Sequence, residues 1–160
     1  MNSDFDRLMQ APELFGGLFF VVREYEGSTA SGTFSCECFL KSPEHALASF
    51  FPGLAEFLLE KYSELSRHAC DNNKSASFIY ELKDTELAHA LEHLIAEEIA
   101  SLGVARLDIV GRTGWKKEGD KCGPYRIIVT APIDKKQFES CLYRAASSLD
   151  EACAQSLFSL

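Results

Sequence analysis

The sequence predicts an α+β fold in which helices pack on one face of a mainly antiparallel β-sheet. Segments with alternating apolar residues and segments with helical apolar spacing follow one another as strand, strand, helix, strand, helix, strand, strand, helix. No internal repeat, low-complexity tract or linker divides the chain. Residues 1–160 are therefore expected to form a single domain, which should bury roughly 70% of its unfolded surface.

Five segments have the composition of strands and lie at about 18–25, 33–40, 76–82, 104–110 and 125–131. A turn-rich link from Gly27 to Gly32 joins the first two, which are predicted to pair as a hairpin. Residues 1–16, which precede them, are expected to form a short helix or an arm that ends near Gly16-Gly17.

The first predicted helix begins at Ser42-Pro43-Glu44. This tripeptide supplies a hydroxyl cap, a proline at the first helical position and an acid in the first turn. Pro52-Gly53 should break or kink the helix, which then resumes and ends near residue 67. A polar loop is expected after it, at about 68–75.

Two longer helices are predicted further along the chain. The first covers 85–102, with Asp84 or Thr85 as its cap and Gly103 as its stop. The second covers 134–155 and has apolar residues at helical spacing along its length. Both should lay an apolar side on the sheet.

The charge of the chain limits the partners to be expected. It carries 16 basic and 24 acidic residues, a formal net charge of −8 at pH 7. Without a long basic run, this balance argues against nucleic acid or an anionic membrane as partner and suits a cationic substrate. The apolar run at 18–22 is too short to cross a bilayer and follows acidic residues, so no targeting segment is recognised and a cytoplasmic protein is expected.

The six cysteines are expected to be reduced thiols. Their number is even, but no secretion signal accompanies them, and the absence of a Cys-x-x-Cys pair gives no support to a ribbon-type zinc site. Cys36 and Cys38 lie two apart in an alternating strand and are predicted to pack in the core.

The motif that bears most on function is His89-Ala90-Leu91-Glu92-His93, inside the predicted 85–102 helix. Residues four apart on a helix lie one above the other, so His89 and His93 can offer two imidazoles to one ion. Glu92, beside them, can hold or deprotonate a water on the metal. This inverzincin pattern predicts a zinc hydrolase. The alternative is a helix whose polar face carries these residues by coincidence.

A catalytic zinc needs a third protein ligand and an open position. Glu97 continues the four-residue spacing, but at 1.5 Å per residue it lies about 12 Å from His89 along the helix axis. Glu97 is therefore expected to support the site from outside, or to be an exposed acid. The candidates for third ligand, among which the sequence does not choose, are His68, Cys70, Cys122 and a glutamate of the last helix.

Four short motifs carry a resemblance to a known family: His68-x-Cys70, Ala88-His89-x-x-Glu92-His93-x-x-x-Glu97, Gly111-Arg112-Thr113 and Gly123-x-Tyr125. They resemble the N-terminal domain of cyanophycin synthetases over 68–131, about 40% of the chain, while the first sixty residues agree only in element order and size. The ligase domains of the synthetases are absent from the sequence, so a standalone form of the domain is expected. The resemblance implies binding of an arginine–aspartate polymer and, as in some members, a metallopeptidase-like site that cleaves it.

The helix motif is also similar to that of S-ribosylhomocysteinase and of pitrilysin-type peptidases, which implies a fold of their kind. In S-ribosylhomocysteinase a cysteine supplies the third ligand, but Gly111 stands at the matching position here, which counts against that activity. In pitrilysin-type enzymes an Arg/Tyr pair grips the substrate carbonyl, and the resemblance assigns substrate binding to Arg112 and Tyr125. The alternative is an arginine at a strand end and a tyrosine packed at a strand start, on either side of a glycine- and lysine-rich loop at 111–124.

These observations lead to one main hypothesis and two alternatives. The main hypothesis is a zinc-dependent hydrolase of peptidase type, with His89 and His93 as ligands and Glu92 as general base, acting on a cationic or arginine-bearing peptide such as a cyanophycin-like polymer. The first alternative is a non-catalytic domain that anchors such a polymer or a partner protein. The second is a structural metal site closed by four protein ligands.

Overall fold

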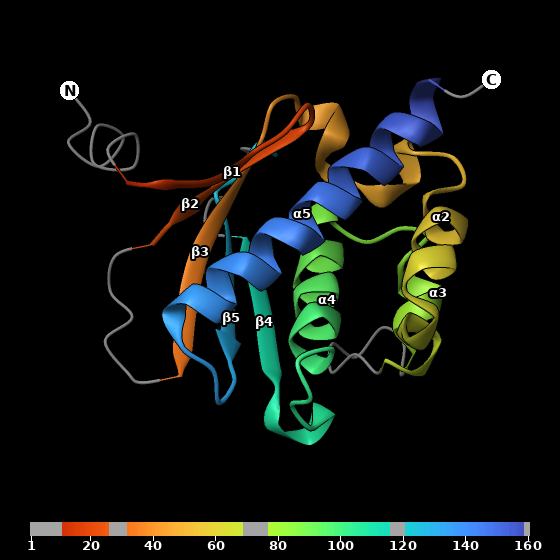
Figure 1. Ribbon diagram of the computed structural model, residues 1–160. Coiled ribbons are helices and arrows are strands. Elements are labelled where there is room, and N and C mark those ends of the chain that lie inside the picture. Colours follow the sequence, from red (N-terminus) through yellow and green to blue (C-terminus); the bar gives the residue numbers. More distant parts are fainter. Residues whose placement is uncertain (1–10, 26–31, 69–76, 116–120, 159–160) are drawn as a thin grey trace.

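The computed structural model describes residues 11–25, 32–68, 77–115 and 121–158. In this part of the chain, five antiparallel strands form one sheet in the order β1-β2-β3-β5-β4 (Figure 1). The strands are β1 (Glu13–Gly16), β2 (Phe20–Glu24), β3 (Thr33–Leu40), β4 (Val110–Trp115) and β5 (Tyr125–Thr130). The α-helices are α2 (Leu54–Lys61), α3 (Phe78–Glu81), α4 (Leu87–Ala100) and α5 (Lys135–Phe158). Short 3-10 turns are η1 (Pro43–Ala46), η2 (Ala48–Phe50), η3 (Ser63–Arg67) and η4 (Arg106–Asp108).

Helices α4 and α5 cover one face of the sheet (Figure 1). α4 packs on β4 and β5, α5 packs on β1, and the two helices pack on each other. On their other side, α2 contacts α5 and η3 contacts α4. As a result α4 lies in the middle of the molecule, with 10 of its 14 residues buried. An enclosed helix of this kind is apolar on more than one face, and any polar group on it needs a reason to be there.

The central strands bury alternate side chains against the helices, as their period of two requires. The buried residues on this face are Phe20 and Val22 of β2, Cys36 and Cys38 of β3, and Tyr125, Ile127 and Val129 of β5. Core packing of Cys36 and Cys38 is thus confirmed, and burial raises the pKa of Cys36 to about 12. The edge strand β4, by contrast, is exposed along most of its length.

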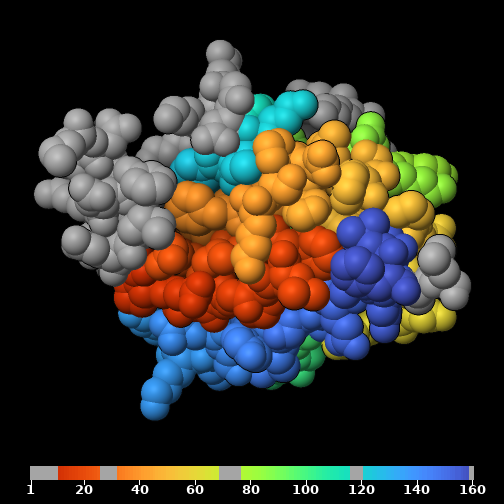
Figure 2. Space-filling model, turned by 90° about the horizontal axis from the view of Figure 1, so that it is seen from above, coloured from red at the N-terminus to blue at the C-terminus, as the bar shows by residue number. Residues whose placement is uncertain are grey.

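The turn between β1 and β2 lies against α5, as Figure 2 shows for the red strands beside the blue helix. The backbone N–H groups of Leu18 and Phe19 donate to the carboxylate of Asp150 at 2.9 and 3.0 Å. Gly17 permits this approach, because a Cβ there would lie 2.5 Å from Asp150 Oδ1 and 2.7 Å from the ring of Phe15. The contact fixes this edge of the sheet to the last helix.

The main features of the predicted fold are confirmed. The class is α+β with an antiparallel sheet, and the segments predicted as a hairpin pair as β2 and β3, with Val22 opposite Cys38. The predicted 85–102, 125–131 and 134–155 segments form α4, β5 and α5. Gly103, with a φ of 93°, adopts the left-handed conformation that ends a helix where an L side chain would be strained.

The predicted strand at 76–82 is wrong. Its described residues form the single helical turn α3, in which the N–H of Leu82 donates to the carbonyl of Phe78. Phe78 and Leu82 are both almost fully buried. They lie four residues apart, so both point the same way from one helical turn.

Three other boundaries differ from the prediction. Residues 104–110 contain the turn η4, and the strand β4 begins only at Val110, so most of it lies in the 111–124 segment predicted as a loop. Residues 13–16 form the edge strand β1, where a helix or arm was expected, while residues 1–10 lie outside the described part. The start predicted at Ser42-Pro43-Glu44 is followed by two 3-10 turns instead of a helix.

The predicted cap of the motif helix is also wrong. Glu86 precedes α4 without a side-chain cap, and the hydroxyl of Thr85 lies 2.7 Å from His89 Nδ1. The predicted continuation of α2 to residue 67 is divided into α2 and η3. Among the described residues, no helix has the length and apolar character needed to cross a membrane.

Candidate metal centre

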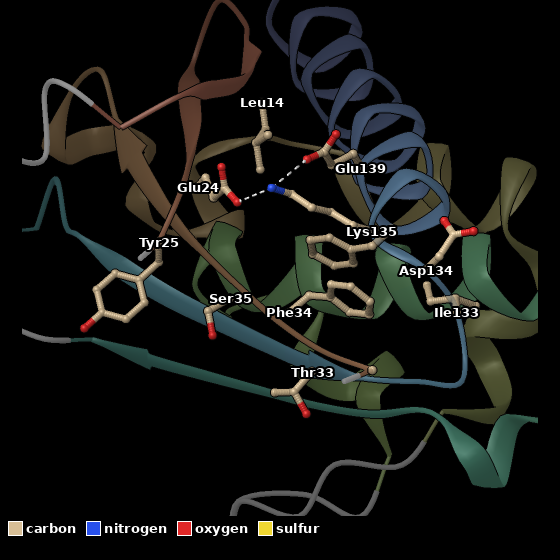
Figure 3. Close-up of a pocket in the computed structure, with 12 residues that line it drawn as sticks. Leu14, Glu24, Tyr25, Thr33, Phe34, Ser35, Ile133, Asp134, Lys135 and Glu139 are labelled. Carbon is tan, nitrogen blue, oxygen red and sulfur yellow. Dashed lines mark ion pairs between the residues drawn. The ribbon is translucent and has the colours of Figure 1, made fainter. Parts of the chain in front are cut away.

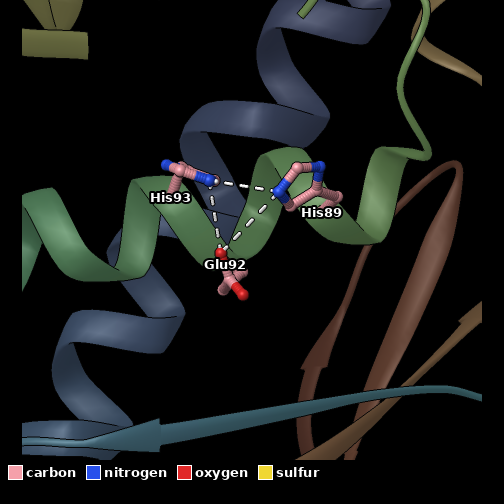
Figure 4. A group of neighbouring side chains, drawn as sticks. All are labelled: His89, Glu92 and His93. Carbon is pink, nitrogen blue, oxygen red and sulfur yellow. Dashed lines mark hydrogen bonds and ion pairs between the residues drawn. The ribbon is translucent and has the colours of Figure 1, made fainter. Parts of the chain in front are cut away.

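The side chains of His89, Glu92 and His93 come together on α4 (Figure 4). The Nε2 atoms of the two histidines are 3.1 Å apart. Glu92 Oε2 lies 3.3 Å from His93 Nε2 and 4.0 Å from His89 Nε2. Because the three residues occupy positions i, i+3 and i+4, the helix itself places them on one side.

These separations fit a metal ion. A four-coordinate zinc with bonds of about 2.0–2.1 Å holds its ligand atoms about 3.3 Å apart. The His89–His93 and Glu92–His93 donor separations, 3.1 and 3.3 Å, match that value, and the Glu92–His89 separation, 4.0 Å, is longer. Three protein donors of imidazole and carboxylate type, with a fourth position left for water, are the donor set of catalytic zinc sites. The group could therefore hold a metal ion.

The two histidines of the group are largely buried but keep some exposure to solvent. Their side chains are 16% exposed for His89 and 10% for His93. The ring of His93 stacks on Phe78, with centroids 3.7 Å apart and planes at 11°. Burial, together with the neighbouring His89 and His68, lowers the pKa of His93 to about 2. His93 is thus a neutral imidazole, the form that ligates a metal.

Glu92 points from α4 toward strand β4. Its Oε1 accepts a hydrogen bond from the hydroxyl of Thr113 at 3.3 Å. Burial raises the pKa of Glu92 to about 7, although the Thr113 bond acts in the opposite direction. Gly111 on the same strand approaches so closely that a Cβ there would lie 2.9 Å from Glu92 Cγ and Cδ. The edge strand therefore fixes where this carboxylate can lie.

A second layer of polar groups contacts the histidines at their other ring nitrogens. Thr85 Oγ1 lies 2.7 Å from His89 Nδ1, and His68 Nδ1 lies 2.8 Å from His93 Nδ1. The second nitrogen of His68, Nε2, lies 2.5 Å from Glu97 Oε1. Glu97 also forms an ion pair with Arg106, whose Nη2 lies 3.3 Å from Glu97 Oε2. The expected supporting position of Glu97 thus matches its place in the structure.

None of the described residues that the sequence offered as a third ligand lies within the group formed by His89, Glu92 and His93. His68 reaches the Nδ1 edge of His93, away from the Nε2 atom in the group. Cys122 is half-buried beside the end of β3, where its carbonyl accepts from the N–H of Leu40. On the last helix, Glu139 lies near Lys135, and Glu151 is exposed. Cys70 lies outside the described residues.

Arg112 and Tyr125 do not meet at the site. Thr113 points to the helix side of β4, so its neighbour Arg112 points to the opposite face of the sheet. Tyr125 is buried on the helix side, donates to the carbonyl of Lys121 at 2.8 Å and stacks on Trp115. The structure therefore shows no joint grip by these two side chains. The sequence indicated no role for Phe78 or Arg106, and it named Thr113 only as part of the Gly111-Arg112-Thr113 motif, not as a partner of Glu92.

A separate hollow of about 320 Å³ lies between β2, β3 and the start of α5 (Figure 3). Phe34 and Phe138 stack there with centroids 4.6 Å apart. Lys135 Nζ lies 2.7 Å from Glu24 and 3.9 Å from Glu139. The described residues that line it include neither histidine nor cysteine. The metal-binding chemistry of the described chain is thus concentrated on α4.

Comparisons with known proteins do not place the chain in a family. No model of a protein family matches it, and a search of curated proteins finds no match either.

Proposed function

We propose that the protein is a zinc-dependent hydrolase of peptidase type whose metal is held by His89, Glu92 and His93. The observation that carries the proposal is the spacing of the three donor atoms, 3.1, 3.3 and 4.0 Å, on one buried helix. Zinc suits two neutral imidazoles and a carboxylate. A buried acid, a buried histidine and a partly buried histidine on the central helix would otherwise destabilise the fold.

Each residue has a defined part in this proposal. Zinc, when bound, supplies a water of lowered pKa and polarises the substrate carbonyl. His89 and His93 would hold the ion through Nε2. Glu92, assigned from sequence as the general base, lies near enough to His93 to be the third donor instead, because its Oε2 faces the two histidines and its Oε1 accepts from Thr113.

The proposed substrate is a cationic or arginine-bearing peptide, of the kind that the resemblance to cyanophycin synthetases implies. The net charge of −8 favours the approach of a cationic chain. In the described part of the sheet, β4 pairs only with β5, so one edge of it is open to an extended peptide. Gly111 and Thr113 of this strand both contact Glu92, so a peptide lying there would pass close to the metal.

Cleavage of an arginine–aspartate polymer by zinc-loaded protein tests the proposal, with zinc content measured on the same samples. We expect Glu92→Gln to lose both zinc and cleavage, because an amide is a much poorer ligand than a carboxylate. Loss of cleavage by about two orders of magnitude with zinc retained would return Glu92 to the role of general base. Glu98→Gln, six positions further along α4, is the matched control.

A non-catalytic binding domain is the second candidate, favoured by the low exposure of the three side chains, 9–16%. In that case wild type and Glu92→Gln will bind the polymer equally, and neither will cleave it. Equal cleavage by both proteins would contradict the hydrolase proposal, since the activity would arise elsewhere.

A further inference from the structure

Three polar side chains extend from the Nδ1 edge of His93, away from the three donor atoms of the candidate metal centre. His68 Nδ1 lies 2.8 Å from His93 Nδ1, and His68 Nε2 lies 2.5 Å from Glu97 Oε1. Arg106 then pairs with both oxygens of Glu97. These residues come from three parts of the fold: His68 follows η3, Glu97 is on α4 and Arg106 begins η4. Because they come from separate elements, their linkage in one series ending at His93 Nδ1 is not a consequence of helix geometry alone.

The far end of this series fixes the first donors and acceptors in it. Arg106 can only donate, so Glu97 is held as a carboxylate that can only accept. Burial raises the pKa of Glu97, but the contacts with Arg106 and His68 outweigh burial and lower this pKa overall. His68 must then donate to Glu97 through Nε2. In a neutral ring, its Nδ1 is left as an acceptor.

The same accounting determines the tautomer of His93. If His68 Nδ1 accepts, the partner 2.8 Å away, His93 Nδ1, must carry the hydrogen and donate it. His93 Nε2 is then the unprotonated nitrogen, and its lone pair faces His89 Nε2 at 3.1 Å and Glu92 Oε2 at 3.3 Å. That is the nitrogen the proposed ion needs, and a metal-bound histidine typically donates its other N–H to such a partner.

We propose that His68, held by Glu97 and Arg106, is a positioning residue that sets the tautomer and the ring orientation of His93 for metal binding. The inference rests on the proposed metal site. It also changes the role of His68, which the sequence offered as a possible third ligand. His93 Nδ1 and Nε2 lie on opposite sides of one ring, so a group bonded to Nδ1 acts through the ring rather than on the ion.

The test uses two substitutions at His68 with opposite expected results. His68→Leu removes both hydrogen bonds and should weaken zinc binding by about 10–100-fold, the usual effect of losing an outer partner. In His68→Gln the amide can accept from His93 and donate to Glu97, so affinity should stay within about threefold of wild type. Zinc affinity is measured by chelator competition on folded protein, with folding checked by circular dichroism.

A matched pair on α4 tests the rest of the chain. Glu97→Gln weakens the acceptor for His68 and should lower affinity by about tenfold, the smaller end of that range. Glu98→Gln alters a neighbouring acid that bonds instead to Tyr62 at 2.7 Å and to Arg144 at 3.0 Å. It should leave zinc affinity unchanged.

The tautomer of His93 provides a readout that general destabilisation does not move. Long-range ¹H–¹⁵N spectra of the metal-free protein should show His93 protonated at Nδ1 in wild type and in His68→Gln, and a mixture in His68→Leu. The same mixture of tautomers in all three proteins would overturn the inference. An equal loss of zinc affinity in His68→Gln and His68→Leu would also overturn it, because His68 would then be a direct ligand. Unchanged zinc affinity in both variants would overturn it as well.

Zinc binding by wild type and by His89→Ala shows separately whether the metal site exists. If wild type binds no zinc, or binds it equally after His89→Ala, the metal site itself is wrong. The tautomer spectra then still decide whether His68 orders His93, because they are recorded without metal.

Discussion

Replacing Glu92 by glutamine should stabilise the metal-free protein. Burial raises the pKa of Glu92 from 4.5 to about 7, with the Thr113 hydroxyl acting against the rise. At pH 8 the folded protein therefore holds an ionised carboxylate at a cost that the unfolded chain does not bear. This pKa difference corresponds to about 3 kcal/mol. Glutamine keeps the shape but must find its own hydrogen bonds, so we expect a net gain of about 2 kcal/mol.

The gain should depend on pH in a defined direction. Below pH 4.5 the carboxyl is protonated in both folded and unfolded states, and the two proteins should differ little. Between pH 4.5 and 7 the unfolded chain ionises first, so wild type loses stability as the pH rises. Above pH 7 the full difference is present. Thermal unfolding with a chelator present should show the melting temperature of Glu92→Gln raised by about 4–8 °C at pH 8.

Glu97→Gln is the control of opposite sign. Burial raises the pKa of Glu97, but its contacts with Arg106 and His68 outweigh this and lower it. Loss of that charge should destabilise the fold by about 1–3 kcal/mol at pH 8. The reasoning is refuted if Glu92→Gln is no more stable than wild type at pH 8, or if its gain is the same at pH 4 and pH 8.

Two further predictions concern the surroundings of the site. Gly111→Ala places a Cβ 2.9 Å from Glu92 and should weaken zinc binding by about tenfold with little loss of stability. Gly114→Ala is the control on the same strand, because a Cβ there has nothing within 4 Å, and it should change neither zinc affinity nor stability. Equal zinc affinities of the two variants in a competition assay would contradict this. Phe78→Ala removes the fully buried ring stacked on His93 and should lower the free energy of unfolding, measured in urea, by about 3–5 kcal/mol. A decrease below about 1 kcal/mol would contradict this and show that neighbouring side chains fill the space of the ring.

The parts of the fold that sequence predicts correctly are those buried along a whole face. β2, β3, β5, α4 and α5 repeat their apolar spacing several times, so the period is evident. β4 lies at the exposed edge and contains Gly111 and Gly114, so it has no such repeat. α3 is a single turn, and over five residues Phe78, Tyr80 and Leu82 alternate as well as they fit a helix.

The site was predictable only as far as one helix extends. The proximity of His89, Glu92 and His93 follows from helical geometry and needs no tertiary information. Thr113 and His68 arrive from distant segments. Arg112 and Tyr125 show why such partners are hard to infer, because a shift of one residue in the register of a strand changes the face to which every side chain points.

Metal analysis of the purified protein tests the central claim most directly. After zinc reconstitution and removal of excess metal, we expect about one zinc per chain in wild type and in His45→Ala, a histidine control away from the site. The double substitution His89→Ala with His93→Ala should retain none. A wild-type protein that holds no zinc, or a double variant that holds as much as wild type, would contradict the account.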